Sequence, residues 1–139
     1  MGGVTQMDEI RAHVAHERDS KLEGWDGIVS WRTLLSADRT PTAGFTVGTA
    51  EIQAGASVEG ALHHHEHHEF YYFTSGNGSV YLDGVEEAVE PGAIVFVPGT
   101  MPHFVRNTGT EPLCFLYALP SDEFSHVEYV FPQVETAQK

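Results

Sequence analysis

From residue 27 onward the chain is a succession of short runs rich in Val, Ile, Thr, Tyr and Phe, separated by Gly, Pro and Asn. The separating turns recur about every eight to twelve residues, which is the spacing of an antiparallel sandwich or barrel. This pattern predicts an all-β fold built from ten short strands. They are 28–35, 43–53, 57–63, 69–75, 79–82, 85–89, 94–97, 103–107, 113–119 and 126–131.

Two turn signals fix neighbouring strands in this scheme. The sequence Gly-Asn-Gly at 76–78 and the sequence Asp-Gly at 83–84 supply residues that tolerate the positive φ of a tight hairpin turn. They predict hairpins at 69–82 and 79–89.

A helix is expected before the strands begin. The segment from Thr5 to Asp8 resembles a capping box in which Asp replaces the usual Glu. Ile10 and Val14 follow at helical spacing, so we expect one short amphipathic helix that ends near Asp19.

The length of 139 residues fits one domain with one core. We divide the chain into an N-terminal segment (1–26) that packs on the barrel, the barrel itself (27–133) and a frayed polar tail (134–139). No run reaches the roughly 20 consecutive apolar residues of a membrane helix. The first residues lack the basic start and apolar core of a secretory signal, so a cytoplasmic location is expected.

Acidic residues dominate the charge of the chain. Seven Lys and Arg stand against twenty Asp and Glu, which gives a formal net charge of −13. Nucleic acid and anionic membranes bind basic surfaces, so neither is expected as a partner, and a small molecule is. Cys114 is the single cysteine, which excludes an internal disulfide and a cysteine-based metal cluster. Any metal must therefore be held by histidines and carboxylates.

Five histidines and two glutamates fill residues 63–69. Alternate residues of a strand share a face, so His63 and His65 point the same way. Glu69 opens the next antiparallel strand after a tight corner and can return to the same point. His103, on a later strand, can supply a fourth ligand from across the barrel. We therefore expect one divalent metal on these four residues; the alternative is that some of them only line a polar barrel mouth.

Three neutral imidazoles and one carboxylate suit Fe, Mn, Ni, Zn or Cu, and the sequence does not choose among these ions. Open positions on such a metal suit catalysis better than a structural role. The remaining histidines, His64, His67 and His68, are interpreted as solvated corner residues, with a second metal site as the alternative. His67 is placed at the rim of the pocket.

These residues resemble the two sequence motifs of the cupin superfamily. The first motif shortens the usual spacing before its first histidine, and the second has a threonine where glycine is common. The stretches that carry the resemblance are Gly60-x2-His63-x-His65-x3-Glu69-x6-Gly76 and Gly92-x5-Pro98-x4-His103-x3-Asn107, with Thr100 at the exchanged position. The resemblance implies a single antiparallel jelly-roll barrel of six to ten strands, with a metal near one end on the same four residues.

A narrower likeness comes from the segments 30–35, 69–71 and 122–131, which are similar to single-domain bacterial cupins that include the dimethylsulfoniopropionate lyases. Those lyases carry a tyrosine two residues after the ligand glutamate, and this position is Tyr71 here. The resemblance implies that Tyr71 is catalytic, because a phenolate that takes an acidic α-proton starts a β-elimination. The other role open to Tyr71 is that of an interior aromatic with a paired hydroxyl.

Cupins differ widely in function, so the fold does not select one. Our first hypothesis is a mononuclear metal-dependent enzyme acting on a small carboxylate, in the version of a lyase. An Fe-dependent dioxygenase and a non-catalytic small-ligand-binding or sensor cupin are the alternatives.

The sequence also suggests candidate substrate contacts and a homodimer. His67 and Phe73 are the candidate substrate contacts, and core packing is the other role open to Phe73. Trp31 and Arg32 are interpreted as residues of an outer or edge strand. Aromatic residues and Arg are enriched at protein interfaces, so a homodimer is expected.

Overall fold

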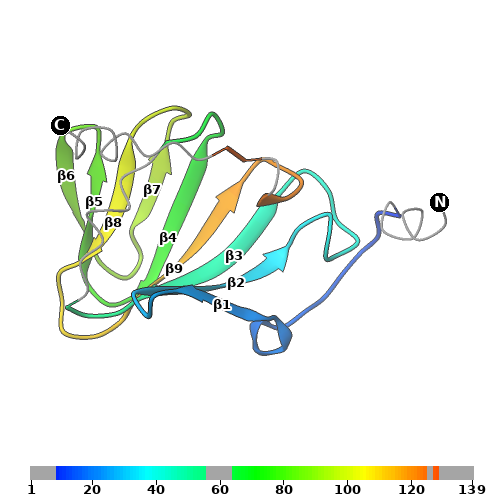
Figure 1. Cartoon of the computed structure of the whole chain (residues 1–139), viewed down its shortest axis with the longest axis horizontal. Helices are drawn as coiled ribbons and strands as arrows, with labels where there is room; N and C mark the ends of the chain where they lie inside the picture. The colour runs from blue at the N-terminus through cyan, green and yellow to red at the C-terminus, as the bar shows by residue number, and fades with distance from the viewer. Residues whose placement is uncertain (1–8, 56–63, 125–126, 129–139) are drawn as a thin grey trace.

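The computed structural model describes residues 9–55, 64–124 and 127–128. Within these residues the strands form two antiparallel sheets that enclose one core (Figure 1). One sheet has the order β1-β2-β3-β9-β4-β7 and the other β6-β5-β8. The elements are η1 (Glu17–Asp19), β1 (Leu22–Trp25), β2 (Val29–Leu35), β3 (Thr46–Ile52), β4 (Glu69–Ser75), β5 (Gly78–Leu82), β6 (Val85–Val89), β7 (Ile94–Val97), β8 (His103–Asn107) and β9 (Leu113–Leu119). The predicted all-β antiparallel fold is confirmed.

The core lies between the two sheets. Along β4, buried and exposed residues alternate as the pleat requires, so Tyr71 and Phe73 point inward while Phe70 and Tyr72 point outward. Phe73 is fully buried, and Val80 on β5 meets the same cluster from the opposite sheet. The alternation of β4 therefore places one row of side chains inside the barrel.

Asn107, at the end of β8, joins the two sheets through its side chain. Its amide nitrogen donates to the carbonyl of Ile52 on β3 at 2.9 Å and to the carbonyl of Glu111 at 2.8 Å. Its amide oxygen accepts from the backbone N–H of Gly109 at 2.8 Å. The side chain is buried, so these bonds satisfy groups that have little access to water.

One of the two predicted hairpins is confirmed and the other is wrong. β5 and β6 pair directly across the turn at Asp83 and Gly84. β4 pairs with β7 and β9, whereas β5 belongs to the other sheet, so residues 76–78 carry the chain between sheets. Gly76 has a φ of 87°, and a Cβ there would collide with the backbone of Pro112. The glycine was correctly identified as a turn residue, but the strand after the turn joins a different sheet.

The predicted helix is wrong over the part that the structure describes. Residues 9–16 have no regular structure, and only the 3-10 helix η1 follows, with the ring nitrogen Nδ1 of His16 accepting from the N–H of Arg18. The apolar side chains of Ile10 and Val14 are exposed. A short amphipathic helix is stabilised mainly by packing of its apolar face, and that packing is missing here.

The strand β1 was not expected from the sequence. Its four residues include a glycine and have no β-branched side chain, but they pair in register with β2, Leu22 opposite Arg32 and Trp25 opposite Val29. The turn between these strands contains Asp26 and Gly27, both with positive φ. This Asp-Gly pair is the same signal that identified the turn at 83–84.

Two further expected strands lie wholly or mostly outside the described residues, and the position of β2 contradicts one interpretation. The expected strand 57–63 lies outside the described residues, as does most of 126–131. The interpretation of Trp31 and Arg32 as edge-strand residues is wrong, because β2 lies between β1 and β3. Trp31 packs against the core instead.

In the described part of the chain, no helix has the length and apolar character needed to cross a membrane.

Replacing Asn107 with Ala is expected to lower the free energy of unfolding by about 2–4 kcal/mol, because one buried carbonyl, one part-buried carbonyl and one part-buried N–H lose their partner. Urea unfolding followed by circular dichroism measures the change. Thr110→Ala, at an exposed position of the following loop, is the control and should change stability by less than about 0.5 kcal/mol. Equal effects of the two substitutions would contradict the role given to Asn107.

Candidate metal centre

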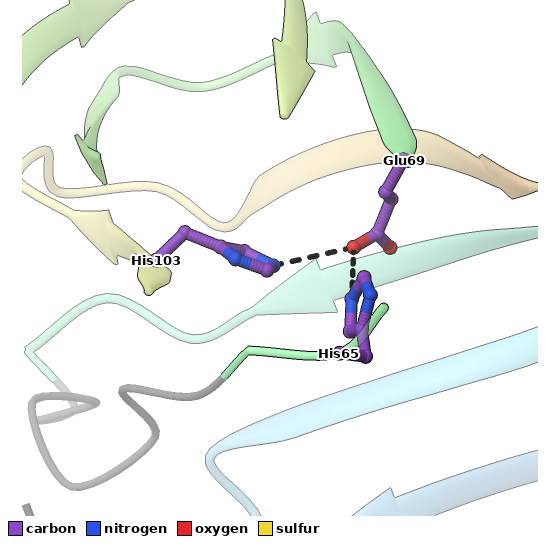
Figure 2. A group of neighbouring side chains, drawn as sticks. All are labelled: His65, Glu69 and His103. Carbon is purple, nitrogen blue, oxygen red and sulfur yellow. Dashed lines mark hydrogen bonds and ion pairs between the residues drawn. The ribbon is translucent and has the colours of Figure 1, made fainter. Parts of the chain in front are cut away.

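Three of the predicted ligands come together from three different segments of the chain. Glu69 is the first residue of β4 in the six-stranded sheet, and His103 is the first residue of β8 in the three-stranded sheet. His65 lies in the connection that precedes β4 (Figure 2). The fourth predicted ligand, His63, lies outside the described residues.

The three side chains point toward one another at a buried place. Nε2 of His65 lies 3.1 Å and Nε2 of His103 lies 3.3 Å from the same carboxylate oxygen, Oε1 of Glu69 (Figure 2). One ligand atom from each residue can be chosen so that all lie within 4.8 Å of one another. None of the three residues is more than 7% exposed. The two imidazole rings meet edge to face, with centroids 5.1 Å apart.

Backbone carbonyls decide which ring nitrogens are available as ligands. Nδ1 of His65 lies 2.9 Å from the carbonyl oxygen of His67, and Nδ1 of His103 lies 2.8 Å from that of Met101. A carbonyl oxygen only accepts hydrogen bonds, so each Nδ1 carries the proton and donates. In the neutral rings the lone pairs of both Nε2 atoms are then directed at the Glu69 carboxylate.

Lone pairs at this distance from a carboxylate repel it unless a proton or a metal ion lies between them. The donor set of two imidazole nitrogens and one carboxylate oxygen is one that divalent transition metals accept. Histidine ligands also commonly donate their second N–H to a carbonyl, as both rings do here. The residues therefore fit a metal.

Glu69 is ionised in this arrangement. Burial of the carboxyl group acts to raise its pKa, but hydrogen bonds from His103 and His65, which form when a proton also occupies Nε2 of these rings, outweigh burial and lower the pKa to about 2. A buried carboxylate of this kind presents a full negative charge to whatever occupies the centre.

Tyr71 lies beside the three ligands on the inner face of β4. Its hydroxyl donates to Oε1 of Glu69 at 3.2 Å, and the residue is 5% exposed. Its ring is in contact with Phe115, with centroids 5.2 Å apart. A phenol that reaches a ligand oxygen can also reach a small molecule bound at the same centre.

The two candidate substrate contacts occupy different depths. His67 is half-buried, and its Nδ1 is buried without a hydrogen-bond partner among the described residues. Phe73 is fully buried and packs against Tyr71 and Phe115, below the ligands along β4. Contact of either residue with a substrate stays a prediction.

Tyr117 is an interior polar residue that the sequence analysis did not identify. It lies directly opposite Tyr71 in the pairing of β4 with β9, and its hydroxyl is buried without a hydrogen-bond partner among the described residues. Burial raises the pKa of Tyr117 to about 12; the nearby Thr33 hydroxyl opposes this shift and the Glu69 carboxylate adds to it. The alternation of residues 113–119 places Tyr117 on the inner face, which was the signal available in the sequence.

The corner histidines have separate surroundings. His68 is exposed, and its Nδ1 accepts from the backbone N–H of Gly99 at 2.8 Å. This bond ties the connection that carries His65 to the segment between β7 and β8. His64 is half-buried and is not a member of the group formed by the three ligands.

Comparison with solved structures supports the fold. The polyketide cyclase RemF from Streptomyces resistomycificus is similar with a TM-score of 0.68 and 24% identity, over 79% of this chain and 80% of that chain. An RmlC-like cupin from Shewanella frigidimarina has a TM-score of 0.66 and 21% identity, over 81% and 95%. Oxalate decarboxylase OxdC from Bacillus subtilis, as its S161A mutant, has a TM-score of 0.65 and 25% identity, over 77% and 29%.

Comparison of sequences gives a relative and a family. The chain is 33% identical over 105 residues to dimethylsulfoniopropionate lyase DddW from Ruegeria pomeroyi. These 105 residues cover 76% of this chain and 67% of that protein. Residues 48–119 match the family described as Cupin domain. The matched residues span both sheets and include the three candidate ligands His65, Glu69 and His103. This chain belongs to the cupin family.

Proposed function

We propose that this chain is a metal-dependent lyase that removes a leaving group from the β-carbon of a small carboxylate. The observation that carries the proposal is the hydrogen bond from the Tyr71 hydroxyl to Glu69, which puts a candidate base next to a candidate metal ligand inside the barrel. The 33% identity to a dimethylsulfoniopropionate lyase supports this reaction class and suggests the substrate.

His65, Glu69 and His103 would hold the metal, with His63 as the proposed fourth ligand. When bound, a divalent ion supplies a Lewis acid that anchors the substrate carboxylate and acidifies the neighbouring C–H. The ionised Glu69 reduces the net positive charge of the centre and accepts from Tyr71, which holds the phenol oxygen in a fixed direction. Fe, Mn, Ni, Zn and Cu all remain compatible with this donor set.

In the proposed reaction Tyr71, whose hydroxyl donates to Glu69 in the structure, first gives up this proton to solvent, and the resulting phenolate oxygen takes the α-proton of the substrate. The electron pair of the broken C–H bond forms the double bond between the α- and β-carbons, and the β-carbon to sulfur bond breaks with its electrons going to sulfur. Dimethylsulfoniopropionate then gives acrylate and dimethyl sulfide, and the proton taken by Tyr71 passes to solvent. The reaction consumes no oxidant.

The remaining site residues have proposed roles at the two ends of the substrate. The Nδ1 of His67, which has no hydrogen-bond partner among the described residues, can hydrogen-bond a polar substrate group at the rim. The aromatic rings of Tyr71 and Phe73, with centroids 6.2 Å apart, offer π-faces to a cationic sulfonium group.

Purified chain is expected to contain close to one equivalent of a transition metal. His65→Ala, Glu69→Gln and His103→Ala each remove a proposed ligand. Loss of a residue that only supports a ligand weakens metal binding by roughly 10–100-fold, so each of these three substitutions should weaken it by more than that. Metal analysis after dialysis against a weak chelator measures this. His64→Ala is the matched control and should keep its metal, and His63→Ala tests the fourth ligand. Retention of metal by all three ligand variants would contradict this centre.

Replacement of Tyr71 by Phe should leave the metal content unchanged and lower kcat by roughly 100- to 10,000-fold, the range expected for loss of a general base. Acrylate release from dimethylsulfoniopropionate, followed by chromatography, is the measurement. Tyr72→Phe, on the outer face of the same strand, is the control and should retain full activity. A Tyr71→Phe enzyme with unchanged kcat would limit this residue to packing.

Turnover is expected to proceed at equal rates under air and under nitrogen, because the elimination needs no oxygen. Acrylate and dimethyl sulfide should form in a one-to-one ratio in both atmospheres. A reaction that requires oxygen would instead support the dioxygenase hypothesis. Metal-loaded protein that binds but does not convert a panel of small carboxylates would support a binding cupin.

A further inference from the structure

The outer face of β4 and β7 carries large apolar side chains that remain exposed in the described structure. Phe70 and Tyr72 on β4 are 37% and 44% exposed, and Ile94 and Phe96 on β7 are 66% and 61% exposed. Phe70 lies opposite Phe96, and Tyr72 lies opposite Ile94. We call these four residues the β4–β7 face. They form one contiguous patch, since directly opposed side chains on one face of a sheet are neighbours.

On the neighbouring strand β9 the same side of the sheet is also apolar but largely buried, with Ala118 6% exposed and Leu116 half-buried. Ala118 lies opposite Phe70 and Leu116 lies opposite Tyr72, on the same side of the sheet. These positions and the β4–β7 face include no charged residue, although the chain has seven basic and twenty acidic residues. A strand that is apolar on both faces, as β9 is, is typical of a sheet covered on both sides.

We propose that the β4–β7 face is the interface between two copies of this chain, related by a two-fold axis. A two-fold interface must be complementary to itself, and an uncharged apolar surface meets that condition without pairing opposite charges. Each copy carries a formal net charge of −13, so approach through the charged surfaces is repulsive. The charge-free face is where two copies meet at the lowest electrostatic cost.

The area available is close to what a specific dimer requires. Phe, Tyr and similar side chains present about 150–250 Å² each, so the exposed fractions of the four residues leave roughly 400 Å² on each copy. Two copies then bury about 800 Å² from these side chains alone, and a rim that includes the exposed residues His68 and Thr74 brings the total near the ~1,000–1,200 Å² of small specific interfaces.

The properties of β7 favour a dimer in which the faces of two sheets pack together over one in which the edge strands of two sheets pair. β7 is an outer strand of its sheet and is only four residues long, with Pro91 and Pro98 close to its ends. Proline has no N–H to donate, so a second chain that extended the sheet at this edge would find few partners. Two copies therefore stack sheet against sheet, as in a β-sandwich.

The face borders the connection that carries a candidate metal ligand. The ring of His68 lies against that of Phe96, with centroids 5.3 Å apart, and the same His68 accepts from Gly99. The proposed dimer would therefore cover the outer side of the corner that precedes Glu69. It does not depend on the lyase proposal, because no residue of the β4–β7 face is a proposed ligand or base.

Light scattering coupled to size-exclusion chromatography tests this interface on the full chain at about 10–100 µM, where a specific dimer is populated. The molar mass measured for the wild-type protein should be twice the 15.3 kDa mass of one chain. Ile94→Asp and Phe96→Asp place like charges on both sides of the two-fold axis, so each should raise the dissociation constant at least about 100-fold. Phe96→Ser is the milder second variant, and circular dichroism checks that all variants fold.

Val85→Asp is the matched control. Val85 is an apolar residue on β6 in the other sheet, and at 55% it is nearly as exposed as Ile94, so this variant should remain a dimer. A monomeric wild type would overturn the proposal and leave the β4–β7 face to another segment or another protein. Folded Asp and Ser variants that remain dimers would overturn it as well, because the copies would then meet elsewhere.

Discussion

The centre depends on one buried carboxylate, that of Glu69. A carboxylate that leaves water costs several kcal/mol unless cationic or donor groups compensate it. Here Oε1 accepts from Tyr71 and faces the Nε2 atoms of His65 and His103, which come from different segments of the chain. The sheets must therefore hold β4 and β8 at a fixed separation. The bonds of Asn107 to the carbonyls of Ile52 and Glu111 are one of the devices that hold it.

Much of this fold follows from the sequence because its signals are local. Strand alternation and turn residues predicted most of the described strands, and Glu69–Ser75 was predicted with the bounds that are observed. Interpretations that depended on contacts distant in the chain were wrong. The helix after Thr5 lacks a surface to pack on, at least over the described residues, and the residues after Gly76 join the opposite sheet. A short stretch of sequence determines neither whether a segment packs against the rest of the chain nor which sheet a strand joins.

The same distinction applies to the centre. Spacing within residues 63–69 and the position of His103 were enough to nominate the ligands, and three of them do converge. Tyr117 was missed because its relation to Tyr71 is set by the pairing of β9 with β4, strands that are far apart in sequence. Ring tautomers were also beyond the sequence, since they depend on the carbonyls of His67 and Met101. Spacing therefore nominates donors, and tertiary structure decides their protonation and their neighbours.

Strand β4 brings chemistry and surface together. Its inward residues begin with the candidate ligand Glu69 and the candidate base Tyr71, whereas Phe70 and Tyr72 form half of the uncharged outer patch. Side chains alternate along a strand, so a slip of one residue would move the carboxylate to the outside and the apolar rings to the centre. Pairing on both edges, with β7 and with β9, opposes such a slip. The register of this one strand thus determines both which side chains reach the candidate metal centre and which side chains form the exposed apolar face.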